Sequence, residues 1–219
     1  MTESTPAAPG DAAIAIVRDG YDRMADRYAD WAAAIRDDAR ERTTSRLLAL
    51  LPPAADVLDL GCGNGLPTAR LLAGLGHRVT AIDVSAEQVA RCRANVPEAT
   101  AARAEMTEAA FPAGSFDAVV SFYAITHVPR ERHEALFTRI PGWLRPGGLF
   151  AASLGAGETD GVEADWLGVP MAFSHFDADA NRALLREAGF ALLHDEVAAT
   201  VEDGAPVSFL WVIGRAPSA

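Results

Sequence analysis

The chain has 219 residues, half of them hydrophobic and 22% charged, which suits one sizeable globular domain with a substantial core. Its formal net charge of −11 argues against a nucleic-acid partner, because a phosphate backbone requires clustered Lys and Arg side chains. The two cysteines, Cys62 and Cys92, form neither a CxxC pair nor a zinc-ligand spacing, which predicts reduced thiols and no bound metal.

The N-terminal quarter is predicted to be a tail followed by a helical cap. Residues 1–11 are polar and lack Lys and Arg, which predicts a disordered tail rather than a signal peptide. No apolar run approaches the roughly 18–20 residues that cross a bilayer, so we expect a cytoplasmic protein without a membrane partner. The cap comprises residues 12–54, with a second helix at about 38–51 that ends at Pro52. Its first helix carries one apolar face: Val17, Tyr21, Met24, Tyr28, Trp31 and Ile35.

Residues 55–219 alternate between strand-like and helix-like segments, which is typical of parallel strands joined by right-handed crossovers. Ser85 and Gln88 form a capping box at the start of one helix. The link 201–206 is too short for a crossover, so the last two strands must be antiparallel. The expected strands are 56–60, 78–82, 99–103, 116–122, 147–154, 190–197 and 207–214, with helices at 65–75, from 85, at 129–144 and from 177 to Gly189.

The turn after the first of these strands contains three glycines, in the sequence LDLGCGNG. In an open α/β sheet, ligands bind beyond the carboxyl ends of the strands, so this turn is a candidate cofactor site. A dinucleotide-binding turn would have a third glycine in place of Leu66, and Asp59 would repel a pyrophosphate. The pattern favours S-adenosylmethionine (SAM), a cationic nucleoside without phosphate.

The sequence VLDLGCGNG resembles the first motif of class I SAM-dependent methyltransferases, and later segments agree with the family in order and spacing. The resemblance implies a Rossmann-like fold with a mostly parallel seven-stranded sheet, an antiparallel C-terminal strand and an N-terminal helical cap. It also implies methyl transfer from SAM, with S-adenosylhomocysteine as the product. The first motif would supply six cofactor contacts: Asp59, Gly61, Cys62, Gly63, Asn64 and Gly65.

The other cofactor contacts follow from later segments of the same resemblance. Asp83 ends the second strand, and its carboxylate would accept both ribose hydroxyl protons. Val84 follows it and is expected to contact the cofactor too. Glu105 and Met106 match the family's adenine-binding positions, although the family more often has Asp than Glu. Three further segments resemble family motifs. The fourth-strand motif is matched by SFDAVVSFYAITHV (115–128), the turn into the fifth strand by LRPGGLF (144–150), and the lid by GYDRMADRY (20–28). The first and third of these segments add four contacts: Ser121, Phe122, Tyr21 and Tyr28.

Structural alternatives for these residues stay open at this point. The glycines could serve only a tight strand-to-helix turn, and Asp83 could cap a helix. Tyr21 and Tyr28 could belong to the core, although a buried phenol group requires a polar partner. Asp117 opens its strand at the edge away from the cofactor and is interpreted as structural.

Two histidines are candidate catalytic residues. In-line methyl transfer mainly requires alignment, and an oxygen nucleophile benefits further from a base with a pKa near neutral, whereas an amine or thiol needs only orientation. His127 follows the fourth strand, and His175 lies in the connection 155–178. Either histidine could instead cap a helix or anchor a loop. The acidic and aromatic residues of 155–178 predict a substrate wall.

The acceptor is expected to be a small, non-anionic molecule with an O, N or S nucleophile. The Asn/Asp-Pro-Pro-aromatic stretch of base-modifying enzymes, the paired glutamates of arginine methylases and a metal-ligand set are all missing from the sequence. We expect a monomer or homodimer. Two rival functions stay open: a SAM-binding protein without methyl transfer, acting as a sensor or non-methylating catalyst, and an NAD(P)-dependent oxidoreductase, against which the missing third glycine and YxxxK motif count.

Overall fold

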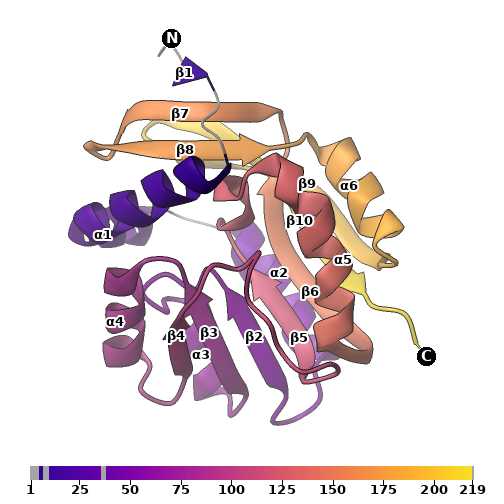
Figure 1. Ribbon diagram of the computed structural model, residues 1–219. Coiled ribbons are helices and arrows are strands. Elements are labelled where there is room, and N and C mark those ends of the chain that lie inside the picture. Colours follow the sequence, from indigo (N-terminus) through magenta and orange to yellow (C-terminus); the bar gives the residue numbers. More distant parts are fainter. Residues whose placement is uncertain (1–4, 7–9, 36–37, 219) are drawn as a thin grey trace.

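A seven-stranded sheet forms the centre of the molecule in the computed structural model, which describes residues 5–6, 10–35 and 38–218. The strands are β2 (Asp56–Leu60), β3 (Arg78–Asp83), β4 (Thr100–Arg103), β5 (Phe116–Ser121), β6 (Leu144–Gly155), β9 (Ala191–Glu202) and β10 (Ala205–Arg215). Their order is β4-β3-β2-β5-β6-β10-β9 (Figure 1). The first five are parallel, and β10 is antiparallel to both of its neighbours. The predicted Rossmann-like fold is therefore confirmed.

Helices cover both faces of this sheet because each central strand is apolar on both sides. One face packs against α2 (Asp38–Leu50), α3 (Thr68–Gly74) and α4 (Ala86–Asn95), and the other against α5 (His133–Trp143) and α6 (Ala178–Glu187). Consecutive residues of β2 show the alternation, since Val57 belongs to the first core and Leu58 to the second. Continuously buried strands of this kind are typical of parallel sheets.

A roof lies over the carboxyl ends of the parallel strands, as Figure 1 shows. It consists of α1 (Gly10–Ala34) and a small antiparallel sheet of β1 (Thr5–Pro6), β7 (Thr159–Trp166) and β8 (Val169–His175). α1 packs against β8 through its predicted apolar face, with Val17 and Met24 buried beside Val169 and Met171. The predicted helical cap therefore combines with a sheet from the second half of the chain.

Two details differ from the sequence predictions. Residues 155–178, expected as a long connection, contain the hairpin β7–β8, whose turn is formed by Leu167 and Gly168, both with positive φ. The tail 1–11, expected to be disordered, contributes β1, which pairs with β7, and α1 begins at Gly10. Backbone hydrogen bonds to β7 account for the order of β1. Residues 1–4 and 7–9 of the tail lie outside the described residues.

Candidate functional site

The glycine turn follows β2 at the point where the sheet order reverses. β2 pairs with β3 on one side and with β5 on the other, so a crevice opens beyond its carboxyl end. The backbone N–H groups of Gly61 and Cys62 donate to the carbonyl of Ile82, which ties the turn to β3. Gly61 has φ of 75°, and a Cβ there would lie 2.2 Å from Cβ of Ala124. Only glycine fits this position.

Asp83, at the end of β3, faces the same crevice. Its carboxylate accepts hydrogen bonds from the backbone N–H groups of Gly63 and Ser85, both at 2.9 Å. Burial raises the pKa of Asp83 to about 6, against the lowering effect of these bonds. The bonds orient the carboxylate toward the crevice. As predicted, Ser85 caps α4 by accepting the N–H of Gln88 at 3.1 Å. The Gln88 side chain does not complete the predicted capping box, because the Ser85 N–H donates to Asp83 instead.

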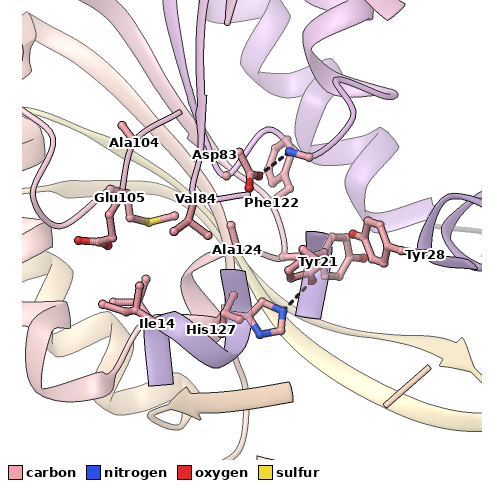
Figure 2. A pocket seen from close by; sticks show the side chains of 16 residues that line it. Ile14, Tyr21, Tyr28, Asp83, Val84, Ala104, Glu105, Phe122, Ala124 and His127 are labelled. Atoms are coloured by element: carbon pink, nitrogen blue, oxygen red, sulfur yellow. Dashed lines mark hydrogen bonds between the residues drawn. The ribbon is translucent and has the colours of Figure 1, made fainter. Parts of the chain in front are cut away.

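A first cavity of about 670 Å³ lies between the strand ends and α1. Figure 2 shows Asp83, Val84 and Phe122 on one side, with Ile14 and His127 opposite them. Glu105 and Tyr28 stand at its two ends in this view. The predicted residues that line it are Tyr21, Tyr28, Gly61, Gly63, Asp83, Val84, Glu105, Met106, Phe122 and His127.

His127 lies in the short helix η1 (Ile125–His127) and joins α1 to the second sheet. Its Nδ1–H donates to the carbonyl of Ala172 at 2.8 Å, which leaves Nε2 to accept the phenol proton of Tyr21 at 2.9 Å. In Figure 2 the dashed line between His127 and Tyr21 marks this bond, and the other dashed line is the bond at Asp83. Burial lowers the pKa of His127 to about 4 and raises that of Tyr21, so both are neutral near pH 7.

A second cavity of about 1640 Å³, open to solvent, adjoins the first. Its walls come from α1, from the hairpin β7–β8 and from the hairpin β9–β10. Four side chains line both cavities: Tyr21, Tyr28, Tyr123 and His127. His175 lines only the second one. Molecules bound in the two cavities would therefore lie next to each other beside these four side chains, hereafter the shared wall.

His175 closes part of the second cavity next to the end of β6. Its Nδ1–H donates to the carbonyl of Gly157 at 2.7 Å, and its ring lies against Gly155. Among the described residues, no hydrogen bond reaches Nε2. Because Nδ1 carries the proton in the neutral ring, Nε2 is a free acceptor. Burial lowers the pKa of His175, so the ring is neutral near pH 7.

Comparison with known proteins identifies the family of this chain. A family model described as a methyltransferase domain matches residues 57–148. The 27-O-demethylrifamycin SV methyltransferase of Amycolatopsis mediterranei is 32% identical over 209 residues, which cover 86% of this chain and 68% of that protein. The chain belongs to the class I SAM-dependent methyltransferases. Other curated relatives match over less of their length; the ubiquinone biosynthesis O-methyltransferase of Xanthomonas axonopodis is 40% identical over 111 residues, 48% of this chain and 45% of that protein.

Solved structures support the same fold for this methyltransferase. The 1,6-didemethyltoxoflavin-N1-methyltransferase of Burkholderia thailandensis, solved with S-adenosylhomocysteine, has a TM-score of 0.75 at 23% identity and covers 99% of this chain and 94% of that one. The cyclase SpnF has a TM-score of 0.73 at 17% identity and covers 99% of this chain and all of that one. SAM is the cofactor of this family, and the oxidoreductase alternative is therefore set aside.

Five of the predicted cofactor residues do not line the first cavity of the methyltransferase: Asp59, Cys62, Asn64, Gly65 and Ser121. Cys62, Asn64 and Gly65 belong to the turn itself, whereas Asp59 and Ser121 lie on β2 and β5. Ser121 donates its hydroxyl to the carbonyl of Leu60 at 2.9 Å, and Asn64 accepts the N–H of Leu66 at 3.0 Å. Asp59 is buried behind the turn, where burial and the charge of Asp83 raise its pKa to about 7.

The structure adds site residues that the sequence prediction missed. Gln88 is 1% exposed, its amide nitrogen and oxygen have no partner among the described residues, and it lies beside Gly63. The capping-box pattern assigns the Gln88 side chain to the Ser85 N–H, so the sequence does not indicate that its amide is free to bind a ligand. Asp22 of α1 accepts the hydroxyl of Ser85 at 2.5 Å and the N–H of Glu87 at 3.1 Å, which fastens the lid to α4. No sequence pattern distinguishes it from other acids of α1.

Tyr123 is a further residue of both cavities. It follows β5 with φ of 61°, an uncommon conformation for a large side chain, and its N–H donates to the hydroxyl of Ser153 at 2.7 Å. The described residues contain no cluster of His, Cys, Asp and Glu that could hold a metal ion. None of the helices in the described ranges has the length and apolar character to span a membrane.

Proposed function

We propose that this methyltransferase transfers the methyl group of SAM to a hydroxyl oxygen of a small molecule bound in the second cavity, hereafter the acceptor cavity. The single observation that carries the proposal is the shared wall of Tyr21, Tyr28, Tyr123 and His127 between the two cavities. A cofactor in the first cavity and an acceptor in the second would bring the two reacting atoms together there, as in-line displacement requires.

The residues of the first cavity fit SAM. Asp83 would accept the ribose hydroxyl protons, and the unpartnered amide of Gln88 offers further bonds beside Gly63. Glu105 and Met106 would hold the adenine at the opposite end from Tyr28. The absence of a side chain at Gly61 makes room for Ala124, which also lines this cavity. SAM supplies a methyl group already activated by its sulfonium.

His175 is the base that we assign to the reaction. As the acceptor oxygen bonds to the methyl carbon, the carbon–sulfur bond breaks and its electron pair stays on sulfur, which gives S-adenosylhomocysteine. The hydroxyl proton passes to Nε2 of His175, which is the proton-free nitrogen because Nδ1–H donates to Gly157. Two curated relatives support an oxygen acceptor by name, the rifamycin enzyme and the ubiquinone O-methyltransferase.

His127 has a different role in this proposal. Its Nε2 already accepts the phenol proton of Tyr21, and its burial keeps the pKa at about 4, so it is a poor proton acceptor. We assign it to positioning Tyr21 in the shared wall. Of the two histidines predicted as catalytic candidates, His175 is therefore assigned as the base and His127 as a positioning residue.

The test screens hydroxyl-bearing small molecules for S-adenosylhomocysteine formation and then compares His175→Ala with His127→Ala. We expect His175→Ala to lose about 10²–10⁴-fold in kcat while SAM affinity stays unchanged. With a phenol acceptor, activity of this variant should recover at high pH, because the phenolate needs no base. His127→Ala should lose less in kcat and show no such recovery.

Other outcomes decide between the candidate functions. Full turnover by His175→Ala would overturn the base assignment while leaving methyl transfer intact. Tight SAM binding without turnover on any acceptor class would favour the non-methylating alternative. SpnF, a cyclase with the same fold, shows why turnover must be measured rather than inferred from the fold.

A further inference from the structure

The charge of the acceptor cavity is unbalanced among the described residues. Three carboxylates line it, those of Glu163, Glu202 and Asp203, against the single guanidinium of Arg40. Arg40 lies over the ring of Tyr123, 4.8 Å from the centroid, which places its charge at the shared wall. The carboxylates of Glu163 and Asp203 lie on β7 and on the β9–β10 turn, at the rim formed by the two hairpins.

Glu163 is the carboxylate of this cavity whose charge no described residue compensates. It forms no hydrogen bond or ion pair among the described residues, and it is partly buried. Burial, together with the charges of Asp165 and Asp203, raises its pKa. Arg40 acts electrostatically on Tyr28 and Asp59, and no cation in the described ranges acts comparably on Glu163. A positive charge on a bound molecule would relieve this repulsion.

Aromatic rings stand next to these carboxylates. Trp166 is the centre of the group, with the rings of Tyr28, Trp31 and Phe173 at 6.1, 5.5 and 5.5 Å between centroids. Trp31 also donates its indole N–H to Asp203 at 3.1 Å, so one carboxylate and one ring are held together. Ring faces attract ammonium groups, so a cationic amine could contact a ring face and a carboxylate here at the same time.

We propose that the acceptor molecule carries a protonated amine, bound at the rim of the acceptor cavity between Glu163, Asp203 and the rings of Trp31 and Trp166. The inference rests on the proposed function, since it concerns the molecule that receives the methyl group. The amine is a recognition group that is held away from the shared wall. The hydroxyl of the same molecule points toward His175 and the cofactor.

Three phenols with the same ring and different charges test the proposal: tyramine, neutral tyrosol and anionic 4-hydroxyphenylacetate. Each is titrated at pH 7.5 into the protein saturated with S-adenosylhomocysteine, with tryptophan fluorescence as the readout because Trp31 and Trp166 line the cavity. We expect tyramine to bind about tenfold more tightly than tyrosol, and the anion to bind most weakly.

Two variants separate charge from shape. Glu163→Gln should weaken tyramine binding by about fivefold and leave tyrosol binding unchanged, because only the charge is removed. Glu158→Gln is the matched control, an exposed acid outside the cavity lining, and should leave all three affinities unchanged.

Equal binding of the three phenols, tightest binding of the anion, or no measurable binding of tyramine would overturn the proposal. An unchanged preference for tyramine in Glu163→Gln would overturn it as well. These measurements need no turnover. The proposed methyl transfer therefore stands or fails separately, in the assay of S-adenosylhomocysteine formation.

Discussion

The affinity for SAM should rise with pH between 6 and 8. Asp59 has a pKa of about 7 and Asp83 of about 6 in the protein without ligand, because burial disfavours their ionised forms. SAM carries a sulfonium and an ammonium, and nearby positive charge favours the ionised carboxylates. Both pKa values must therefore fall on binding. Protons leave as SAM binds, so binding is weaker at low pH.

The magnitude follows from the two pKa values. A group with a pKa of 7 is about one tenth ionised at pH 6 and about nine tenths ionised at pH 8, so Asp59 alone changes Kd about tenfold. Asp83 is about half ionised at pH 6 and adds a factor of about two. The combined change of about twentyfold corresponds to ~1.8 kcal/mol.

Calorimetric titration of SAM in buffers with different ionisation enthalpies measures both the Kd and the number of protons released. We expect release of one to two protons at pH 6 and almost none at pH 8. Asp59→Asn should reduce the dependence to about twofold, the share of Asp83. Asp179→Asn, an exposed acid of α6, should retain the full dependence. A Kd that is constant from pH 6 to 8, without proton release, would refute the electrostatic reasoning.

Three further predictions concern the turn, the lid and the core. Gly61→Ala should abolish SAM binding in the same calorimetric assay, because the new Cβ would lie 2.2 Å from Cβ of Ala124. Gly76→Ala is the control and should retain SAM binding, because Gly76 has a similar φ of 85° but no atom within 4 Å of the new Cβ. Asp22→Asn should weaken SAM binding by about three- to tenfold, since it loosens the contact of α1 with α4, whereas the exposed Asp19→Asn should not; equal affinities would contradict this role of the lid. Phe137→Ala should lower the free energy of unfolding by about 3–5 kcal/mol in urea melts, because the side chain is completely buried between α5 and the sheet; a loss below about 1 kcal/mol would contradict its core position.

The sheet and the cofactor cavity were predictable because local patterns specify them. Each parallel strand is a short apolar run, and each is followed by a helix with its own start and stop signals. The carboxyl ends of such strands meet at one edge, so Gly61, Asp83 and Glu105 were brought together by topology alone. The boundaries shifted where a turn precedes the helix, as at residues 65–67.

The roof was not predictable for a physical reason. Its hairpin turns at Leu167 and Gly168, and leucine with positive φ gives no turn signal in the sequence. β1 has only two residues, and its partner β7 lies more than 150 residues away, beyond any local pattern. The acceptor cavity, built from α1 and two hairpins, depends on these long-range pairings. The acidic and aromatic character of residues 155–178 could be predicted from the sequence, whereas their folding into a hairpin could not.

The hairpin β7–β8 lies in the chain between β6, a strand of the central sheet, and α6, a helix that packs against that sheet. Its two ends are close together, since Gly155 lies against His175. The family model matches residues 57–148 and stops before the hairpin. Side chains of the hairpin line only the acceptor cavity, whereas α1 and Tyr123 line both cavities. A relative's hairpin, grafted between Gly155 and Asp177, would replace side chains of the acceptor cavity alone. Such a graft must keep the packing of β8 against α1 and the Ala172 carbonyl that orients His127, because both support the cofactor cavity.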